Sequence, residues 1–262
     1  MKAFLRSLIL IVALCAGCVA NAQSLDEYLF STGVDTNKWI NLSSYTDVSV
    51  TGSGDSWASS VMNIGFSFPF DEDVYTQYSV NSDGNLRLGS IVTGTGSYSS
   101  PFGSSGAGTN SPKINFFGCD GYLVSNTHYI HSQLFGDTLL VVEYCLGPYS
   151  STYRNNQFTW QVHLYASGKI EAVFGNNSGL SSSNTHQMGL CVNASNGWII
   201  DNTGTATHFT SGSSDNWSAT LWPAEGTYYT FTRPVITCPR PLSAPASNIT
   251  ATTATISFVP GG

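Results

Sequence analysis

The sequence predicts an all-β fold, an antiparallel β-sandwich of jelly-roll-like character, over residues 23–237. Charged residues make up only 10% of the 262-residue chain, and Gly, Ser, Thr and Asn take the polar positions instead, which disfavours helices. Short runs alternate apolar and polar residues with the period of half-buried strands. Turn residues separate these runs. The one plausible helix is a short segment at Gln23–Phe30.

Three runs carry the strand prediction most clearly. Ile64–Phe70 places its large apolar residues on one face, and Pro69 indicates an edge position or a bulge. Leu139–Tyr144 is apolar at nearly every position, which predicts burial on both faces. Gln157–Tyr165 alternates, so His163 is expected at the surface. Further strands are expected at Tyr78–Asn81, Leu86–Leu88, Lys113–Phe117, Tyr129–Phe135, Ile170–Phe174, Met188–Asn193, Trp198–Asp201 and Tyr228–Thr232.

The N-terminus has the features of a secretory signal. Lys2 and Arg6 precede an apolar stretch that is too short to span a bilayer, and an Ala-Asn-Ala cleavage pattern ends at Ala22. We therefore expect residues 1–22 to be removed and the protein to be secreted or displayed at the cell surface. Cys18 raises a lipoprotein alternative, but Cys15 stands where a lipobox usually has Leu, so simple cleavage is favoured.

Charge and cysteine content limit the possible partners. The formal net charge is −7, and loss of Lys2 and Arg6 makes the remaining chain more acidic, so nucleic acid and anionic membranes are not expected partners. Export permits disulfides among the four remaining cysteines, which allow three pairings. Cys119 with Cys145 is the preferred pair, because both are expected at strand ends. A mixture with buried free thiols stays open, and the other two cysteines are Cys191 and Cys238.

The last segment, 238–262, differs in composition from the rest. It opens with the stiff run Cys-Pro-Arg-Pro at Cys238–Pro241, and strands are expected around Asn248–Thr250 and Ala254–Phe258, before Pro-Gly-Gly. This pattern resembles the opening of a fibronectin type III domain, an immunoglobulin-like fold that needs about 100 residues. The resemblance implies an incomplete second domain, with residues 23–237 as one N-terminal module of a longer multidomain protein.

A second resemblance covers about half of the module. Ile64–Phe70, the run Tyr75–Gly89 with its Val-Asn-Ser-Asp-Gly-Asn turn, and Ile114–Phe117 resemble the extracellular β-sandwich modules related to the nidogen-like region. Asp83 stands where those modules often have Asn. Leu140–Tyr144 and Phe158–Phe174 resemble their paired central strands. The resemblance implies a non-catalytic module of a bacterial surface protein and supplies no catalytic residue.

Candidate chemical sites are sparse. His128 and His131 have a spacing that binds metals on helices, but residues three apart on a strand point to opposite faces. A hydrolase would need paired carboxylates, for which the candidates are Glu143, Glu171 and Asp120, with Glu143 either paired with Arg154 or Lys169 or at a strand end. The run Asp71–Asp73 and the turn residue Asp83 offer oxygen ligands for calcium, although a solvated acidic turn is the favoured interpretation. No cofactor motif occurs, and no cofactor or catalytic residue is expected.

The favoured ligand site lies in the loop Ser214–Ser218. Asp215, Asn216 and Trp217 place an aromatic side chain beside polar groups, as in glycan-binding platforms. Trp57, Trp198 and Trp222 also occur near loops, but core or rim packing is the common role of such residues. The sequence therefore predicts an extracellular module for adhesion or for glycan or protein binding. The alternatives are an accessory module of an exported hydrolase and a structural spacer.

Overall fold

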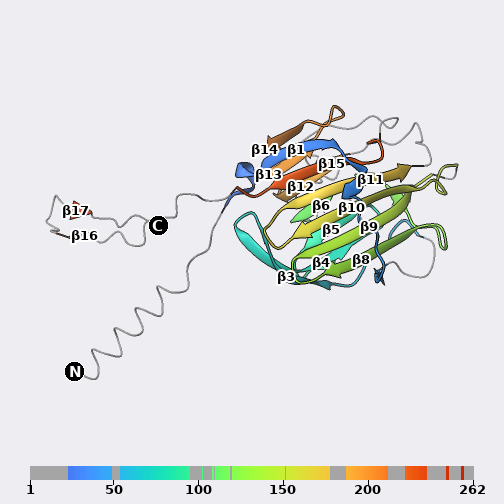
Figure 1. Ribbon diagram of the computed structural model, residues 1–262, viewed down its shortest axis with the longest axis horizontal. Helices are drawn as coiled ribbons and strands as arrows, with labels where there is room; N and C mark the ends of the chain where they lie inside the picture. The colour runs from blue at the N-terminus through green and yellow to red at the C-terminus, as the bar shows by residue number, and fades with distance from the viewer. Residues whose placement is uncertain are drawn as a thin grey trace, which may run out of the picture.

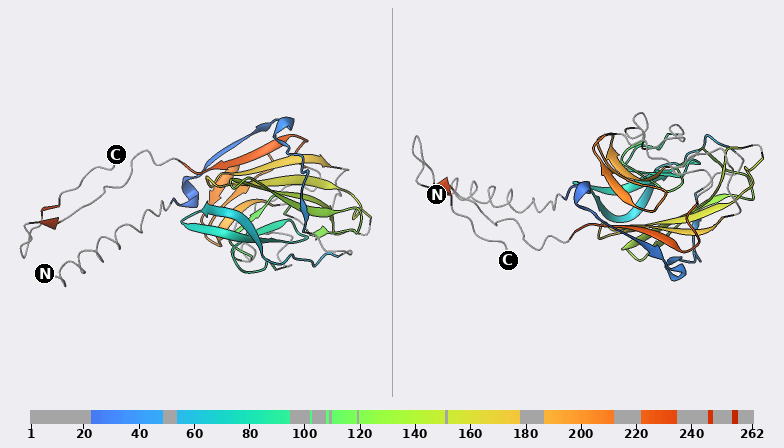
Figure 2. Two further views of the ribbon diagram at one scale, coloured as in Figure 1. Left: turned by 60° about the horizontal axis from the view of Figure 1, so that its bottom comes forward. Right: turned by 90° about the horizontal axis from the view of Figure 1, so that it is seen from above.

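The computed structural model describes residues 23–48, 54–94, 102, 108, 110–118, 120–150, 152–177, 187–211, 222–234, 246–247 and 255–256. Within these residues the chain forms two antiparallel sheets packed face to face (Figures 1 and 2), which confirms the predicted all-β sandwich. The strand order is β1-β15-β11-β10-β9-β8-β2 in the larger sheet, where β7 also pairs with β9, and β14-β13-β12-β6-β5-β4-β3 in the smaller sheet.

The strands differ widely in length. Those of the larger sheet are β1 (Leu29–Val34), β2 (Thr46–Asp47), β7 (Gly121–Tyr122), β8 (Tyr129–Phe135), β9 (Leu139–Pro148), β10 (Phe158–Tyr165), β11 (Ile170–Asn177) and β15 (Thr227–Thr232). Those of the smaller sheet are β3 (Met62–Phe70), β4 (Asp73–Val80), β5 (Asn85–Leu88), β6 (Lys113–Asn115), β12 (Met188–Asn193), β13 (Asn196–Ile200) and β14 (Ala206–Phe209). Separately, β16 (Ala246–Ser247) pairs with β17 (Thr255–Ile256).

A stack of aromatic rings fills the space between the sheets. Trp160 of β10 lies parallel to Tyr144 of β9, with ring centroids 4.6 Å apart, and to Phe117, which follows β6, at 4.9 Å. The Trp222 ring meets Trp160 edge-on at 5.9 Å. Burying one such side chain stabilises the fold by roughly 4 kcal/mol. The stack therefore joins the two sheets at the centre of the core.

The sequence pattern locates the long strands well. β8 and β12 have the predicted bounds, and β9 is buried on both faces along most of its length. Pro69 fits its position because β3 is an edge strand and its register with β4 is irregular between Asn63 and Phe68.

The predicted helix at Gln23–Phe30 is wrong. Residues Leu25–Glu27 form one 3-10 turn, and β1 begins at Leu29. Leu25 and Tyr28 both enter the core, and the backbone amide of Leu25 donates to Asp71 Oδ1 at 2.7 Å. These contacts, together with the pairing of β1 with β15, favour an extended chain over a longer helix.

The predicted Cys119–Cys145 disulfide does not form. Cys145 is a buried free thiol, and its Sγ lies 3.7 Å from the Thr127 carbonyl oxygen. It stands inside β9 rather than at a strand end, between Tyr129 of β8 and Thr159 of β10. Cys191 is also a buried thiol, 3.5 Å from Ser111 Oγ. Cys119 and Cys238 lie outside the described residues.

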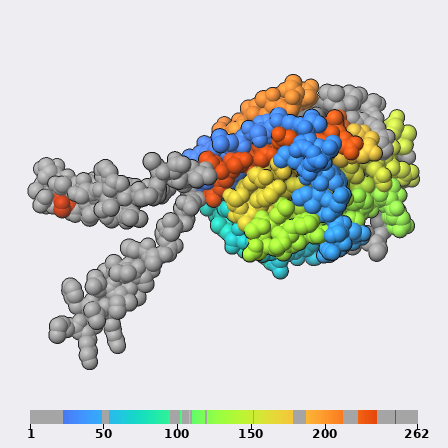
Figure 3. Space-filling model, viewed as in Figure 1, coloured from blue at the N-terminus to red at the C-terminus, as the bar shows by residue number. Residues whose placement is uncertain are grey.

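The segment 35–48, here called the strap, crosses the outer face of the larger sheet (Figure 3, blue over yellow and green strands). It contains a 3-10 turn at Thr36–Lys38 and the short strand β2. The predicted surface position of His163 is wrong for this reason. His163 and Gln161 do point to the outer face of β10, but the strap covers them and both are fully buried.

Gln161 holds the strap by using all of its hydrogen-bonding groups. Its Oε1 accepts from the backbone amide of Ile40 at 3.0 Å and from His163 Nε2 at 2.9 Å. Its Nε2 donates to the Ile40 carbonyl oxygen at 2.6 Å and to Glu143 Oε2 at 2.7 Å. A buried polar side chain is stabilising only when it is satisfied in this way. The amide therefore binds the strap backbone much as a neighbouring strand would.

Glu171 forms the second attachment of the strap. Lys38 Nζ lies 2.7 Å from Glu171 Oε2, and Thr230 Oγ1 donates to the same oxygen at 2.8 Å. Burial alone would raise the pKa of Glu171, but the nearby His163 ring, Lys38 and Thr230 outweigh it and hold this pKa well below its usual range. Burial lowers the pKa of His163, and the neighbouring Glu171 carboxylate opposes this shift.

The turn between β4 and β5 contains a carboxyl group, that of Asp83, whose pKa is raised. Asn81 Oδ1 accepts from the backbone amides of Asp83 and Asn85, and Gly84 has a φ of +73°. A Cβ on Gly84 would lie 2.5 Å from Phe117 Cβ, so the turn requires glycine here. Burial, opposed by a hydrogen bond from the Gly121 amide and assisted by Asp120, raises the pKa of Asp83 to about 8.

We predict that Gln161→Ala destabilises the module by about 3 kcal/mol, because it leaves the Ile40 backbone groups and Glu143 without their buried partner. Urea unfolding at pH 7 measures this. Gln133→Ala is the matched control, since Gln133 binds the strap at Ser44 through one exposed hydrogen bond and should cost less than about 1 kcal/mol. Equal costs for the two variants would show that Gln161 does not dominate the attachment.

We also predict that Asp83→Asn gains stability relative to the native chain as the pH rises. Between about pH 4 and pH 8 the carboxyl of Asp83 ionises in the unfolded chain but not in the folded one, so native stability falls over this range. The variant should gain at least about 1 kcal/mol between these pH values, measured by urea unfolding. Asp201→Asn is the control: burial would raise the pKa of Asp201, but its hydrogen bonds outweigh burial and lower it, so this variant should show no such gain between about pH 4 and pH 8.

Candidate functional site

The predicted ligand platform cannot be placed. Asp215, Asn216 and Trp217 lie outside the described residues. The other tryptophans singled out from the sequence have packing roles. Trp222 belongs to the aromatic core, Trp198 Nε1 donates to the Leu25 carbonyl oxygen at 2.7 Å, and Trp57 packs against the core.

The two histidines of the H-x-x-H pattern do not converge. His128 Nδ1 accepts from the Val124 amide and its Nε2 lies 2.9 Å from the Asn156 carbonyl oxygen. His131 is stacked between the rings of Tyr45 and Tyr129, with centroids at 3.8 and 4.1 Å. Within the described ranges, no group of three or more His, Cys, Asp or Glu side chains is arranged to hold a metal ion.

The carboxylates considered for hydrolysis are engaged in the structure. Glu143 pairs with neither Arg154 nor Lys169; it accepts hydrogen bonds from Tyr129 Oη and Gln161 Nε2. Lys169 lies 3.8 Å from Glu171 instead. Both glutamates are therefore held beneath the strap, where no open surface reaches them.

Of the acidic residues considered for calcium, Asp71 has structural partners and Asp83 has a raised pKa. Asp71 Oδ1 accepts from the Leu25 amide and from Asn196 Nδ2, and so joins the first turn to the smaller sheet. Asp120, the third carboxylate considered for hydrolysis, has its pKa raised to about 6 by burial, assisted by Asp55. Asp83 is protonated over most of the neutral range. Such groups are poor ligands for a hard cation.

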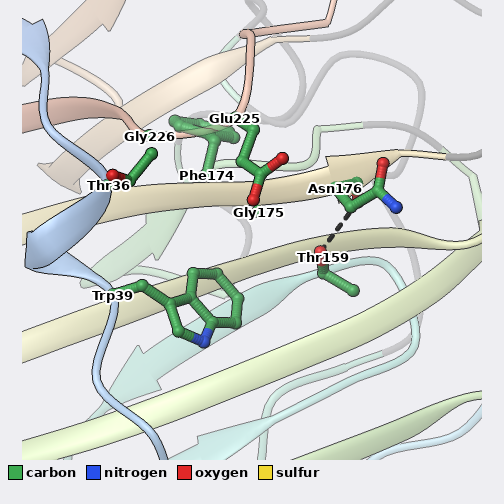
Figure 4. Close-up of a pocket in the computed structure, with 8 residues that line it drawn as sticks. All are labelled: Thr36, Trp39, Thr159, Phe174, Gly175, Asn176, Glu225 and Gly226. Carbon is green, nitrogen blue, oxygen red and sulfur yellow. Dashed lines mark hydrogen bonds between the residues drawn. The ribbon is translucent and has the colours of Figure 1, made fainter.

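An open cleft of about 240 Å³ lies between the strap and the larger sheet (Figure 4). Phe174 and Gly175 of β11 are buried and form its floor, and Trp39 of the strap forms one wall. Exposed polar side chains stand at its rim. The lining residues are Thr36, Trp39, Thr159, Phe174, Gly175, Asn176, Glu225 and Gly226. Three separate parts of the chain therefore meet here: the strap, the β10–β11 hairpin and the turn before β15.

A β-bulge creates the cleft. Phe158 pairs with Asn177 and Trp160 with Phe174, so Thr159 stands opposite two residues, Gly175 and Asn176. Thr159 Oγ1 donates to the Asn176 carbonyl oxygen at 2.7 Å and closes the irregular region. A bulge bends its strand and redirects side chains, and bulges are common beside binding sites.

Gly175 allows the Trp39 ring to pack directly against strand β11. A Cβ at this position would lie 2.5 Å from Thr159 Oγ1 and 2.8 Å from the Trp39 ring. The indole therefore packs its benzene edge against the Gly175 backbone and remains half-buried. The sequence around Trp39 gives no sign of this role, because the residues that form this part of the cleft with it, Thr159 and Gly175, lie more than 100 positions further along the chain.

The cleft has the composition of a small binding site. The Trp39 ring supplies apolar surface, while the Thr36 hydroxyl, the Asn176 amide and the Glu225 carboxylate supply donors and acceptors at the rim (Figure 4). Among the described residues that line it, none has the geometry of a nucleophile with an adjacent base. The arrangement suits recognition rather than covalent chemistry.

We predict that Gly175→Ala closes the cleft and destabilises the module by about 2 kcal/mol, because the added methyl group overlaps Thr159 and displaces Trp39. Thermal unfolding reports the loss of stability. Because the chain has six tryptophans, the displacement of Trp39 is the change in tryptophan fluorescence that Gly175→Ala causes in the native chain but not in a Trp39→Phe chain. Gly54→Ala is the matched control, since a Cβ there meets no atom within 4 Å. An unchanged midpoint and spectrum for Gly175→Ala would contradict the packing described.

Comparison with known proteins identifies the module. A family model described as NIDO related matches residues 27–233 and so covers both sheets, the strap and the cleft. It ends before the fibronectin-like segment, which stays a prediction. Searches of the curated proteins and of the solved structures found no match. In the part of the chain that the structure describes, no helix is long and apolar enough to cross a membrane. The match confirms the nidogen-like resemblance and indicates an extracellular module of non-catalytic type: the chain belongs to the NIDO-related family.

Proposed function

We propose that this protein is a non-catalytic recognition module, exported through its N-terminal signal segment, that binds an extracellular partner through the Trp39 cleft. The observation that carries the proposal is the cleft itself: an aromatic wall, a buried floor and polar rim groups assembled from three parts of the chain. Membership in a family of extracellular modules gives this cleft access to glycans and to proteins outside the cell. The partner is therefore expected to be a glycan or an extracellular protein.

Two further observations support recognition over catalysis. The best candidate acids, Glu143 and Glu171, are committed to the strap and shielded by it. Among the described residues that line the cleft, Glu225 is the one carboxylate, whereas glycosidases use a pair. The acidic surface also disfavours nucleic acid and anionic membranes as partners.

We predict that the chain from Gln23 to Gly262 binds a defined component of an array of glycans and extracellular matrix proteins, and that Trp39→Ala weakens this binding about tenfold. Truncating a central aromatic residue commonly costs this much. Trp217→Ala is the comparison variant. Loss of binding only in the Trp217 variant would move the site to the loop at 214–218 and overturn the cleft assignment. Absence of binding to every component would favour a spacer or an accessory role.

A further inference from the structure

We propose that the ligand of the Trp39 cleft is an uncharged saccharide, with one pyranose ring held against the indole. This inference rests on the proposed function, since it names the chemical class that the same cleft selects. The size, shape and charge of the cleft each contribute to it. At about 240 Å³ the cleft is smaller than the sites that enclose drug-sized molecules, and it suits a single ring.

The wall of the cleft offers a flat apolar surface that is fixed in orientation. Trp39 is half-buried, and its benzene edge is held by the Gly175 backbone, so the ring does not have to be ordered when a ligand binds. Its neighbour Ile40 is fixed on both backbone groups by Gln161. A pyranose ring has a face made of C–H groups, and this apolar face can pack against the indole ring.

The rim supplies polar groups of three kinds around that wall. Thr36 carries a hydroxyl, Asn176 an amide and Glu225 a carboxylate, and all three residues are exposed. Figure 4 shows the Asn176 and Glu225 side chains on the far side of the cleft from Trp39. Sugar hydroxyls both donate and accept, so a ring with several of them can use a hydroxyl, an amide and a carboxylate together.

The charge of the cleft narrows the chemical class of the ligand further. Glu225 is the one charged residue in the described part of the cleft lining, and the chain as a whole is acidic. Lys38, the nearest basic residue along the strap, is bound to Glu171 instead. A uronic acid or sialic acid would bring its carboxylate towards Glu225 without a compensating cation. A cationic peptide would gain little from one exposed carboxylate, because such ion pairs contribute less than about 1 kcal/mol.

The test measures the binding of four kinds of probe to the chain from Gln23 to Gly262 by isothermal titration calorimetry. They are a panel of neutral tetrasaccharides built from glucose, mannose, galactose or N-acetylglucosamine, a tetragalacturonate, a tetralysine peptide, and the array component identified above. We expect a neutral tetrasaccharide to bind, the tetragalacturonate and the tetralysine to bind at least tenfold more weakly, and Trp39→Ala to weaken the neutral probe about tenfold.

Two further variants serve as controls. One distinguishes a loss of binding from misfolding, and the other measures the contribution of the Glu225 charge. Trp39→Phe retains an aromatic wall and should lose less affinity than Trp39→Ala. Glu225→Gln retains the size of the side chain and should reduce the preference for the neutral galactose probe over tetragalacturonate several-fold. Glu225→Gln should keep the unfolding midpoint of the native chain, because Glu225 is exposed. Trp39→Phe should lower it only slightly, because Trp39 is half-buried and lies outside the buried core cluster.

The outcomes separate this inference from the proposed function. Binding of a matrix protein that Trp39→Ala abolishes, without binding of any neutral saccharide, would overturn the saccharide and leave the recognition module standing. Stronger binding of tetragalacturonate or tetralysine than of every neutral probe would also overturn it. If no probe and no array component responds to Trp39→Ala, both proposals fall.

Discussion

The amide of Gln161 is the interaction on which the outer face of this module depends. It forms four hydrogen bonds in a fully buried position, two of them to the backbone of Ile40. Without it the Ile40 backbone, Glu143 and His163 would each lose a buried hydrogen-bond partner. Because Trp39 directly precedes Ile40, the same amide also fixes the wall of the candidate site. A polar side chain at the centre of a strand thus determines both stability and binding geometry.

The site arises from two departures from regular sheet structure. The bulge opposite Thr159 opens space at the end of the β10–β11 hairpin, and the strap covers that space on one side only. Gly175 connects the two, since its missing side chain lets the indole reach the sheet. The aromatic stack beneath holds β9 and β10 in place, so the cleft has a rigid floor. Sites built on rigid elements lose little entropy when they bind.

The sequence predicts which residues face the core of this sandwich, but it does not predict what covers the outer face of the larger sheet. Apolar runs between turn residues locate β8 and β12 to the residue, and period-two alternation indicates β10. The same rule assigns His163 to solvent, since alternation cannot show that residues 35–48 return to cover β10. Trp39 was missed for a related reason: its partners are Gly175 and Thr159, which no local pattern connects to it. Cys145 was placed at a strand end because its strand was expected to stop at Tyr144, whereas β9 continues to Pro148.

The antiparallel pairing of β1 with β15 also determines how the module responds to tension. Leu29, the first residue of β1, lies opposite Thr232, the last residue of β15, so the chain enters and leaves the sandwich at the same end of one strand pair. A force applied to these two ends would separate the pair one hydrogen bond at a time, in the manner of a zipper, instead of loading all of its bonds together. The strap follows β1 along the chain, and its attachment through Lys38 and Gln161 is the next element that such a force would reach. Mechanical load would therefore act on the wall of the cleft before it reached the aromatic core.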